Sequence, residues 1–167
     1  MSNTEADLVA ETVYYIAVRR LQNTYADIVT RRAWAELPSI MDPGCTLSLD
    51  LGDRTRELRG PGEIAEFISG ALERFSFFEF VVLNSVVDVN VPDRSATSRL
   101  YMAELRQNVS DGRRTNAFGV YHDAMSCEDG TWRFLRRHYA SYSRTAIEGP
   151  ENEQVVFDLP VIPLDAI

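Results

Sequence analysis

One carboxylate, Glu104, ends a run of alternating residues that is typical of a β-strand with one buried face. Alternation places these residues on the same face as Glu104: Ala96, Ser98, Leu100, Met102 and Arg106. If Leu100 and Met102 face the interior, Glu104 shares their apolar surroundings. Such surroundings disfavour the charged carboxylate and raise its pKa toward the range useful for an acid or a base. The pattern therefore predicts that Glu104 transfers protons inside a cavity.

The same glutamate also has a purely structural interpretation. Arg106 lies two residues further along the same face, and Arg137 belongs to a later strand, so either arginine offers a salt bridge to Glu104 at a cavity rim. An arginine in a pocket can alternatively hold a carboxylate, an enolate or a leaving anion through two parallel hydrogen bonds. The sequence leaves both interpretations open for these three residues.

Two tyrosines are candidates for stabilising negative charge on a substrate oxygen. Tyr25 has the helical spacing of a plain core residue, but its hydroxyl group can also polarise a substrate oxygen from the cavity floor. Tyr121 shares strand parity with Gly119 and Ala117, two small residues that leave room for a ring. The same parity directs His122 to the outer face of the sheet, so we do not expect His122 to act as the general base.

Composition excludes several other chemistries. The chain has 167 residues, a net charge of −8 and no lysine, so a lysine Schiff base is excluded and nucleic acid is not an expected partner. Cys45 and Cys127 lack metal-ligand spacing, and His122 and His138 are too few for a typical zinc site. We expect two reduced thiols, no metal and no cofactor.

The termini and the apolar runs bear on location. The N-terminal sequence is acidic and polar, unlike a signal peptide, and apolar runs are far shorter than the roughly 20 residues of a membrane span. We therefore expect a cytoplasmic protein with no membrane contact. The length predicts a single folded domain.

Apolar periodicity predicts an α+β order of elements. A long helix covers residues 5–31, a short helix around Trp34 is limited by Pro38, residues 42–44 form a loop, and a third helix follows Pro61. The predicted strands cover residues 45–51, 54–58, 77–91, 94–108, 113–126 and 131–142. The last two strands are joined at Asp129-Gly130, a strong hairpin signal.

The hairpin from Gly119 to His138 also carries a family resemblance. It contains a Gly-x-Tyr-x-Asp strand, an acidic-Gly turn and a Trp-Arg-aliphatic strand that ends in basic residues. With the element order, residues 8–142 resemble the SnoaL-like group of the nuclear-transport-factor-2-like superfamily. The resemblance implies a cystatin-like α+β cone, in which a strongly bent antiparallel sheet wraps the long first helix and leaves a cavity at one end. Residues 1–142 would form this domain, and the tail over residues 143–167 would pack on it or on a partner subunit.

Members of this group such as bile-acid 7α-dehydratase and scytalone dehydratase use an Asp–His pair to expel a leaving group. The resemblance places Thr30, four residues before Trp34, at the Asp position. It places Phe80, four residues before Asn84, at the His position, or Glu79 if the strand carries a bulge. A Thr–Phe pair cannot remove a proton, so this chain cannot use its relatives' chemistry unchanged.

Other positions do match the group. Tyr25 corresponds to a first-helix tyrosine, Glu104 to a catalytic aspartate, and Arg137 to a pocket arginine of the related hexachlorocyclohexane dehydrochlorinase. These three are the expected catalytic residues. The expected substrate-binding residues are Tyr121, Arg106, Asn84, Thr30, Phe80, Leu100, Met102 and Trp34, although Asn84 could equally satisfy a strand bulge.

Three functions stay open. The first is a cofactor-independent lyase, isomerase or cyclase acting on an apolar ring-containing molecule of polyketide, steroid or terpenoid type. The second is a non-catalytic binding protein for such a molecule, because the Asp–His pair is missing. The third is a partner subunit like the β subunits of ring-hydroxylating dioxygenases. By analogy alone, we expect a homodimer through the outer face of the sheet.

Overall fold

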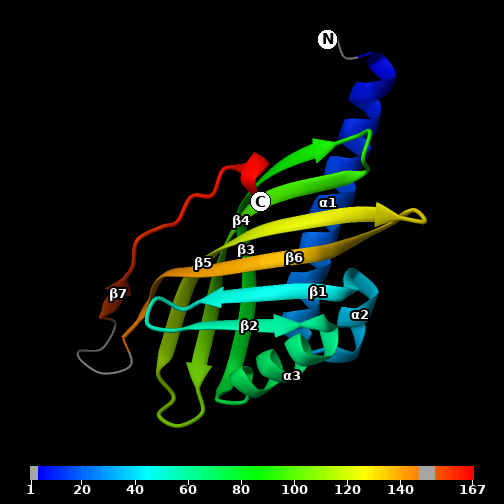
Figure 1. The fold of residues 1–167 in the computed structure, drawn as a ribbon. Helices are drawn as coiled ribbons and strands as arrows, with labels where there is room; N and C mark the ends of the chain where they lie inside the picture. Colours follow the sequence, from blue (N-terminus) through cyan, green and yellow to red (C-terminus); the bar gives the residue numbers. More distant parts are fainter. Residues whose placement is uncertain (1–3, 147–152) are drawn as a thin grey trace.

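The computed structural model describes residues 4–146 and 153–167 (Figure 1). Its elements follow in chain order: α1 (Glu5–Arg31), η1 (Trp34–Glu36), α2 (Leu37–Ile40), β1 (Met41–Asp50), β2 (Thr55–Arg59), α3 (Gly60–Leu72), β3 (Phe75–Asn90), β4 (Ser95–Asn108), β5 (Arg114–Glu128), β6 (Thr131–Thr145), β7 (Gln154–Val156) and η2 (Leu164–Ala166). This order confirms the predicted α+β cone. Among the described helices, none combines the length and apolar character that a membrane crossing requires.

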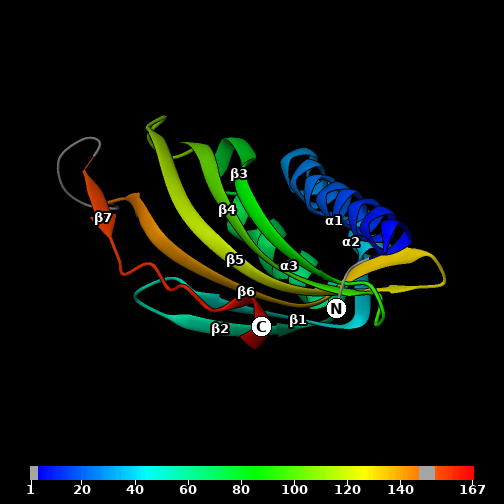
Figure 2. The ribbon, with the colours of Figure 1, turned by 90° about the horizontal axis from the view of Figure 1, so that it is seen from above.

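The sheet is strongly curved, and α1 lies on its concave face (Figure 2). Its strand order is β2-β1-β6-β5-β4-β3, and β7 adds to the far end of β6. The pairing is antiparallel except between β1 and β6, which run parallel. The prediction of a wholly antiparallel sheet was therefore wrong at this one pair. The parallel pair forms because α2 and β1 follow α1 back along the cone and bring β1 beside the last long strand.

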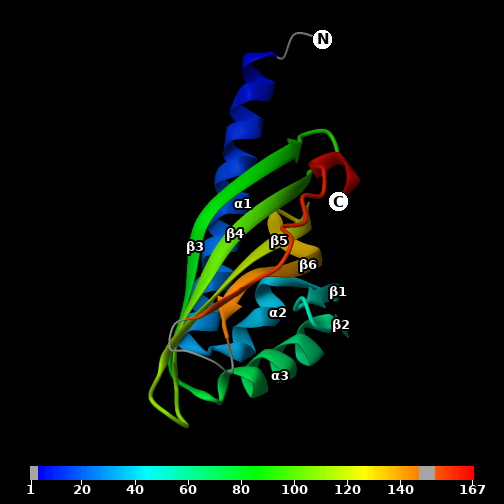
Figure 3. The same cartoon turned by 90° about the vertical axis from the view of Figure 1, so that its left-hand side faces the viewer.

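Helix α1 has the bounds that its periodicity predicted. Thr4 caps it, since the Asp7 amide donates to Thr4 Oγ1 at 3.2 Å and the Thr4 amide donates to Asp7 Oδ2 at 3.1 Å. The helix ends where Arg32 adopts a left-handed conformation with φ 59°. Its C-terminal half buries Val18, Tyr25 and neighbouring residues, whereas the N-terminal half extends beyond the strands (Figure 3).

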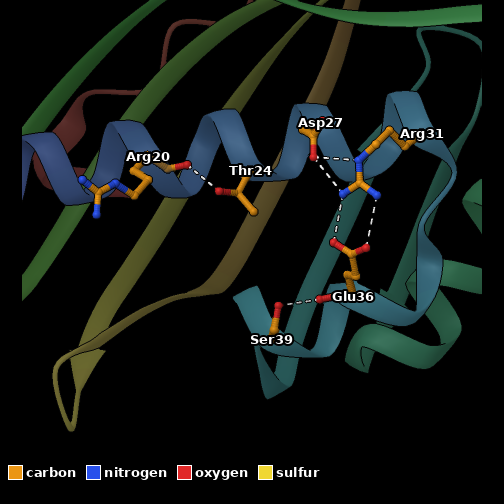
Figure 4. A network of polar contacts seen from close by, with 6 residues as sticks. All are labelled: Arg20, Thr24, Asp27, Arg31, Glu36 and Ser39. Atoms are coloured by element: carbon orange, nitrogen blue, oxygen red, sulfur yellow. Dashed lines mark hydrogen bonds and ion pairs between the residues drawn. The ribbon is translucent and has the colours of Figure 1, made fainter.

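A polar network fixes the exit from α1 (Figure 4). Arg31 donates to Asp27 Oδ2 at 2.9 Å and, with both terminal nitrogens, to Glu36 at 2.9 and 3.1 Å. Ser39 Oγ then donates to the backbone oxygen of Glu36. These exposed pairs contribute little to stability. They set the direction in which η1 and α2 leave the helix.

The Asp129-Gly130 hairpin is confirmed. Glu128 pairs with Thr131 across the turn, and Asp129 and Gly130 have φ of 50° and 76°. Positive φ at both central residues gives a tight turn whose twist matches that of the flanking strands. The turn therefore sets the register in which β5 and β6 face each other.

Two local predictions were wrong. Pro38 does not limit the short helix but lies in the first turn of α2, where a missing amide donor costs nothing. Residues 42–44 belong to β1 rather than to a loop, with an irregularity between Met41 and Thr46 in the pairing to β6. Met41 already pairs with Phe134, so the strand begins before the irregular residues.

The C-terminal segment runs along the convex face of the sheet, opposite α1 (Figure 2). β7 pairs with Ser143 to Thr145 of β6, which is three residues longer than predicted. Further on, the Ile162 amide donates to His122 Nε2 at 3.2 Å, and Arg99 donates to the Ile162 oxygen at 3.3 Å. Residues 147–152 of the predicted tail lie outside the described residues. The described C-terminal segment, residues 153–167, occupies part of the outer sheet face through which we expected a homodimer to form. The homodimer stays a prediction.

Candidate functional site

A cavity of about 520 Å³ lies between α1, α3 and the concave face of the sheet. The apolar residues of its wall come from the helices and from β1 and β3: Val29, Leu47, Leu49, Phe67, Ile68, Leu72, Phe75, Phe78 and Phe80. β4, β5 and β6 contribute Glu104, Tyr121 and Tyr139. A cavity of this size with a few polar groups is typical of a site for a drug-sized ligand.

Glu104 lies in the cavity wall on β4. The predicted alternation holds, because Ala96, Ser98, Leu100 and Met102 are buried on the same face. Arg106 Nη1 donates to Glu104 Oε2 at 3.3 Å. Burial raises the pKa of the Glu104 carboxyl, although the charges of Arg106 and Arg74 act in the opposite direction. Glu104 therefore both pairs with Arg106 and faces the cavity, although the sequence presented these two arrangements as alternatives.

Leu100 and Met102 are fully buried in the core and do not line the cavity. They were expected to contact substrate, but the strand curves so that only its end reaches the open space. Arg106 does line the cavity and is held firmly. It donates to the Asn116 backbone oxygen at 2.5 Å, and its guanidinium carbon lies 5.1 Å from the centre of the Phe75 ring.

Tyr25 and Tyr121 meet at the cavity wall, where their hydroxyl oxygens lie 3.4 Å apart. The Phe80 ring packs against Tyr25 edge to face, with centroids 5.5 Å apart. Burial raises the pKa of the Tyr25 phenol and raises that of Tyr121 well above its ordinary value. Both hydroxyl groups are therefore neutral near pH 7, and either can donate a hydrogen bond to a ligand oxygen.

Gly119 explains how the neighbouring tyrosine fits. A Cβ atom built at Gly119 would overlap the ring of Tyr139, which lies directly over this glycine and also faces the cavity. The room that strand parity predicted beside Tyr121 is thus filled by the Tyr139 ring, whose centroid is 5.0 Å from that of Tyr121.

Arg137 was expected to contact substrate, and it does not line the cavity. It is fully buried behind the two tyrosines, with its guanidinium carbon 3.9 Å from the Tyr25 ring centre and 4.1 Å from that of Tyr121. Its Nε and Nη2 donate to the two carboxylate oxygens of Asp123 at 2.8 and 3.2 Å. Burial lowers the pKa of Arg137, but Asp123, Tyr25 and Tyr121 together outweigh burial, so the pKa is raised and the guanidinium stays protonated.

Sequence reasoning missed Asp123. A signal was available, because Asp123 shares strand parity with Tyr121 and the hairpin register places it opposite Arg137. The four cavity arginines Arg54, Arg74, Arg113 and Arg144 were also missed. Arg54, Arg74 and Arg113 lie in turns next to strands, where no periodic pattern indicates the direction of a side chain.

Thr30 and Phe80, which stand where related proteins have the Asp–His pair, are joined by a hydrogen bond. Thr30 Oγ1 accepts a hydrogen bond from the Phe80 amide at 3.0 Å and so fastens α1 to β3. The Phe80 ring lines the cavity, but the Thr30 side chain does not. Glu79, the alternative to Phe80, is exposed. None of these residues supplies an acid or a base to the cavity.

Two further candidates lie outside the cavity. Asn84 is exposed and follows a register shift between Val82 and Asn84, which fits the strand-bulge interpretation. Trp34 is half-buried beside the core and does not line the cavity. His122 lies on the outer face as parity predicted, and burial lowers its pKa to about 4.

The structure shows the state of both cysteines and whether potential metal ligands lie close together among the described residues. Cys45 and Cys127 are free thiols, and burial raises the pKa of Cys45 to about 12. Within residues 4–146 and 153–167, no cluster of three potential metal ligands occurs. Cys45 is therefore an unreactive core residue.

Comparison with known proteins agrees with this architecture. The model of the SnoaL-like domain family matches residues 14–138, so the chain belongs to this family. No curated protein matched the sequence.

Solved structures with the same fold cover between 76% and 92% of this chain. A protein from Novosphingobium aromaticivorans assigned as a scytalone dehydratase has a TM-score of 0.71 at 16% identity, covering 92% of this chain and 93% of its own. Hexachlorocyclohexane dehydrochlorinase LinA-type3 from Novosphingobium barchaimii has a TM-score of 0.72 at 16% identity, covering 91% and 99%. A cystatin-like protein from Caulobacter vibrioides has a TM-score of 0.62 at 17% identity, covering 76% and 88%. At these identities the likeness establishes the fold alone.

Proposed function

We propose that this protein is a cofactor-independent enzyme of lyase, isomerase or cyclase type that acts on an apolar, ring-containing small molecule in the cavity. One observation carries the proposal: Glu104, a carboxyl group with a raised pKa, lies in the cavity wall together with the aromatic and aliphatic side chains of α1, α3 and β3. The names of two similar structures, a scytalone dehydratase and a dehydrochlorinase, support the same class of chemistry.

In this proposal, Glu104 removes a proton from a carbon next to a carbonyl group of the bound ring. The electron pair moves onto the carbonyl oxygen, and the Tyr25 or Tyr121 hydroxyl donates a hydrogen bond to that oxygen. The enolate then expels a leaving group, attacks a second carbonyl carbon, or takes the proton back at another carbon. These three outcomes correspond to elimination, ring closure and isomerisation, and all begin with the same proton transfer.

Proton exchange tests this first step without knowledge of the natural substrate. The bicyclic ketone 2-tetralone would be incubated with the protein in deuterium oxide, and deuterium uptake next to its carbonyl followed by NMR. We expect Glu104→Gln to lower the catalysed rate at least about 100-fold, the usual contribution of a positioned acid or base. Glu79→Gln, the same change on the exposed face of β3, is the control and should leave the rate unchanged.

A second candidate function is supported by the bond between Thr30 and Phe80. At these positions Thr30 and Phe80 hold α1 to β3, and neither supplies the acid or base that the family resemblance implies. The protein would then bind its ring-containing ligand without changing it. Binding of 2-tetralone at the cavity with no catalysed exchange would favour this candidate over the enzyme.

A further inference from the structure

The charge of the cavity contrasts with that of the whole chain. Net charge is −8 overall, yet the described residues lining the cavity include five arginines and only two carboxylates. The arginines are Arg54, Arg74, Arg106, Arg113 and Arg144, and the carboxylates are Glu104 and Asp111. A cavity built only for an uncharged ring has no physical need for this excess of positive charge.

Ion pairs account for two of the five arginines. Arg106 pairs with Glu104 at 3.3 Å, and Arg144 pairs with Asp53 at 2.9 Å. Within the part of the chain that the structure describes, Arg54, Arg74 and Arg113 make no ion pair. Asp111 offsets only part of this charge. Its carboxylate accepts the Arg113 backbone amide at 2.9 Å within the turn, and the Arg113 charge helps to lower its pKa, but it is one carboxylate against three arginines.

The three remaining arginines come from separate turns. Arg54 lies between β1 and β2, Arg74 between α3 and β3, and Arg113 between β4 and β5. The turns of Arg74 and Arg113 lie at the bottom of Figure 1, and the β1–β2 turn lies apart from them. The Val109 amide donates to the Arg74 oxygen at 2.9 Å and fastens two of these turns together. Gln107 Nε2 donates to the Gly112 oxygen at 3.0 Å, so the turn that carries Arg113 is braced.

We propose that the ligand of this cavity is an amphipathic monocarboxylate, with its carboxylate held at the mouth by Arg74 and Arg113. The inference rests on the proposed function, since it concerns the same cavity. A planar guanidinium matches a carboxylate in two parallel hydrogen bonds, and a cluster of positive charge attracts anions from solution. Holding the acid at this end directs the ring of the ligand inward, toward Glu104 and the two tyrosines.

The test compares two probes of equal shape, naphthalene-2-carboxylate and naphthalene-2-carboxamide, by calorimetric titration. We expect the carboxylate to bind at least about tenfold more tightly at low salt, because only the charged probe gains charge-assisted hydrogen bonds. Arg74→Gln together with Arg113→Gln should abolish this preference. Arg136→Gln, the same change at an exposed position on β6 outside the cavity, should leave it intact.

The outcomes separate the carboxylate inference from the proton-transfer proposal. Equal affinity for the two probes, or an effect of the Arg74 and Arg113 changes no larger than that of Arg136→Gln, overturns the carboxylate inference and leaves the proton-transfer proposal standing. Failure of both probes to bind overturns the inference together with the apolar ligand site. A carboxylate preference in a protein that exchanges no proton of 2-tetralone supports the inference and counts against the enzyme.

Discussion

Asp123 and Arg137 face each other across β5 and β6 as a fully buried ion pair, with Arg137 Nε 2.8 Å from Asp123 Oδ1. The pair places a cation directly beneath the rings of Tyr25 and Tyr121. Cation–π attraction of this kind favours one fixed orientation of each ring. The hydroxyl groups that line the cavity are therefore positioned from behind by a charge that no ligand touches.

Breaking this pair should be costly. Asp123→Ala leaves the buried guanidinium of Arg137 without its counter-charge, so we expect the free energy of unfolding to fall by about 3–5 kcal/mol. Denaturation by urea measures the loss. Asp53→Ala, which breaks the exposed pair with Arg144, is the control and should change stability little. Equal, small effects of both changes would mean that Arg137 finds another partner or stays solvated.

Gly119 should not tolerate a side chain. In Gly119→Ala the added methyl group overlaps the Tyr139 ring, so the ring must move toward the cavity. We expect a loss of about 1–3 kcal/mol in stability and weaker ligand binding. Gly70→Ala is the control, since nothing lies near its Cβ and alanine favours helix over glycine by about 1 kcal/mol. A Gly119→Ala protein with unchanged stability and binding would contradict this packing.

His122 should fasten the C-terminal segment in its neutral form only. Its Nε2 accepts the Ile162 amide, and burial, with the charges of His138 and Arg99, lowers its pKa from 6.5 to about 4. Because the unfolded histidine takes up a proton first, stability falls as pH drops through the window from about 6.5 to about 4. His122→Phe should remove this pH dependence and speed hydrogen exchange at Ile162 at pH 7.

Hydrogen exchange of residues 157–167, followed by mass spectrometry, measures both effects. For protection at pH 7, His138→Phe is the matched control, because its ring lies 6.2 Å from that of His122 but makes no hydrogen bond to the segment among the described residues. Equal protection of the segment in all three proteins would show that the hydrogen bond at His122 does not fasten it.

Local signals in the sequence were enough for the elements that depend on near neighbours. The helical period gave the bounds of α1, and the turn residues Asp129-Gly130 set the last hairpin. Strand parity also placed Glu104 in the cavity wall. The parallel pairing of β1 with β6 joins segments some 90 residues apart, roughly the longest separation in the sheet, and no local pattern encodes it.

Parity alone could not separate residues that line the cavity from residues buried behind it. Arg137, Leu100 and Met102 all face inward, yet other side chains cover them. The cavity arginines were unpredictable for a different reason. Arg74 and Arg113 lie in turns, where the direction of a side chain depends on the folded backbone and not on a period.

The most direct test of the account is a carbon-13 NMR titration of the Glu104 carboxyl group. Burial is expected to place its pKa above the ordinary value of 4.5, and Arg106→Gln should raise the pKa further, because the positive charge of Arg106 lowers it. A midpoint above 4.5 that increases in Arg106→Gln is the predicted result. A midpoint at or below 4.5, unaffected by Arg106→Gln, would contradict the claim that Glu104 is a partly buried carboxyl group in the cavity wall, poised for proton transfer.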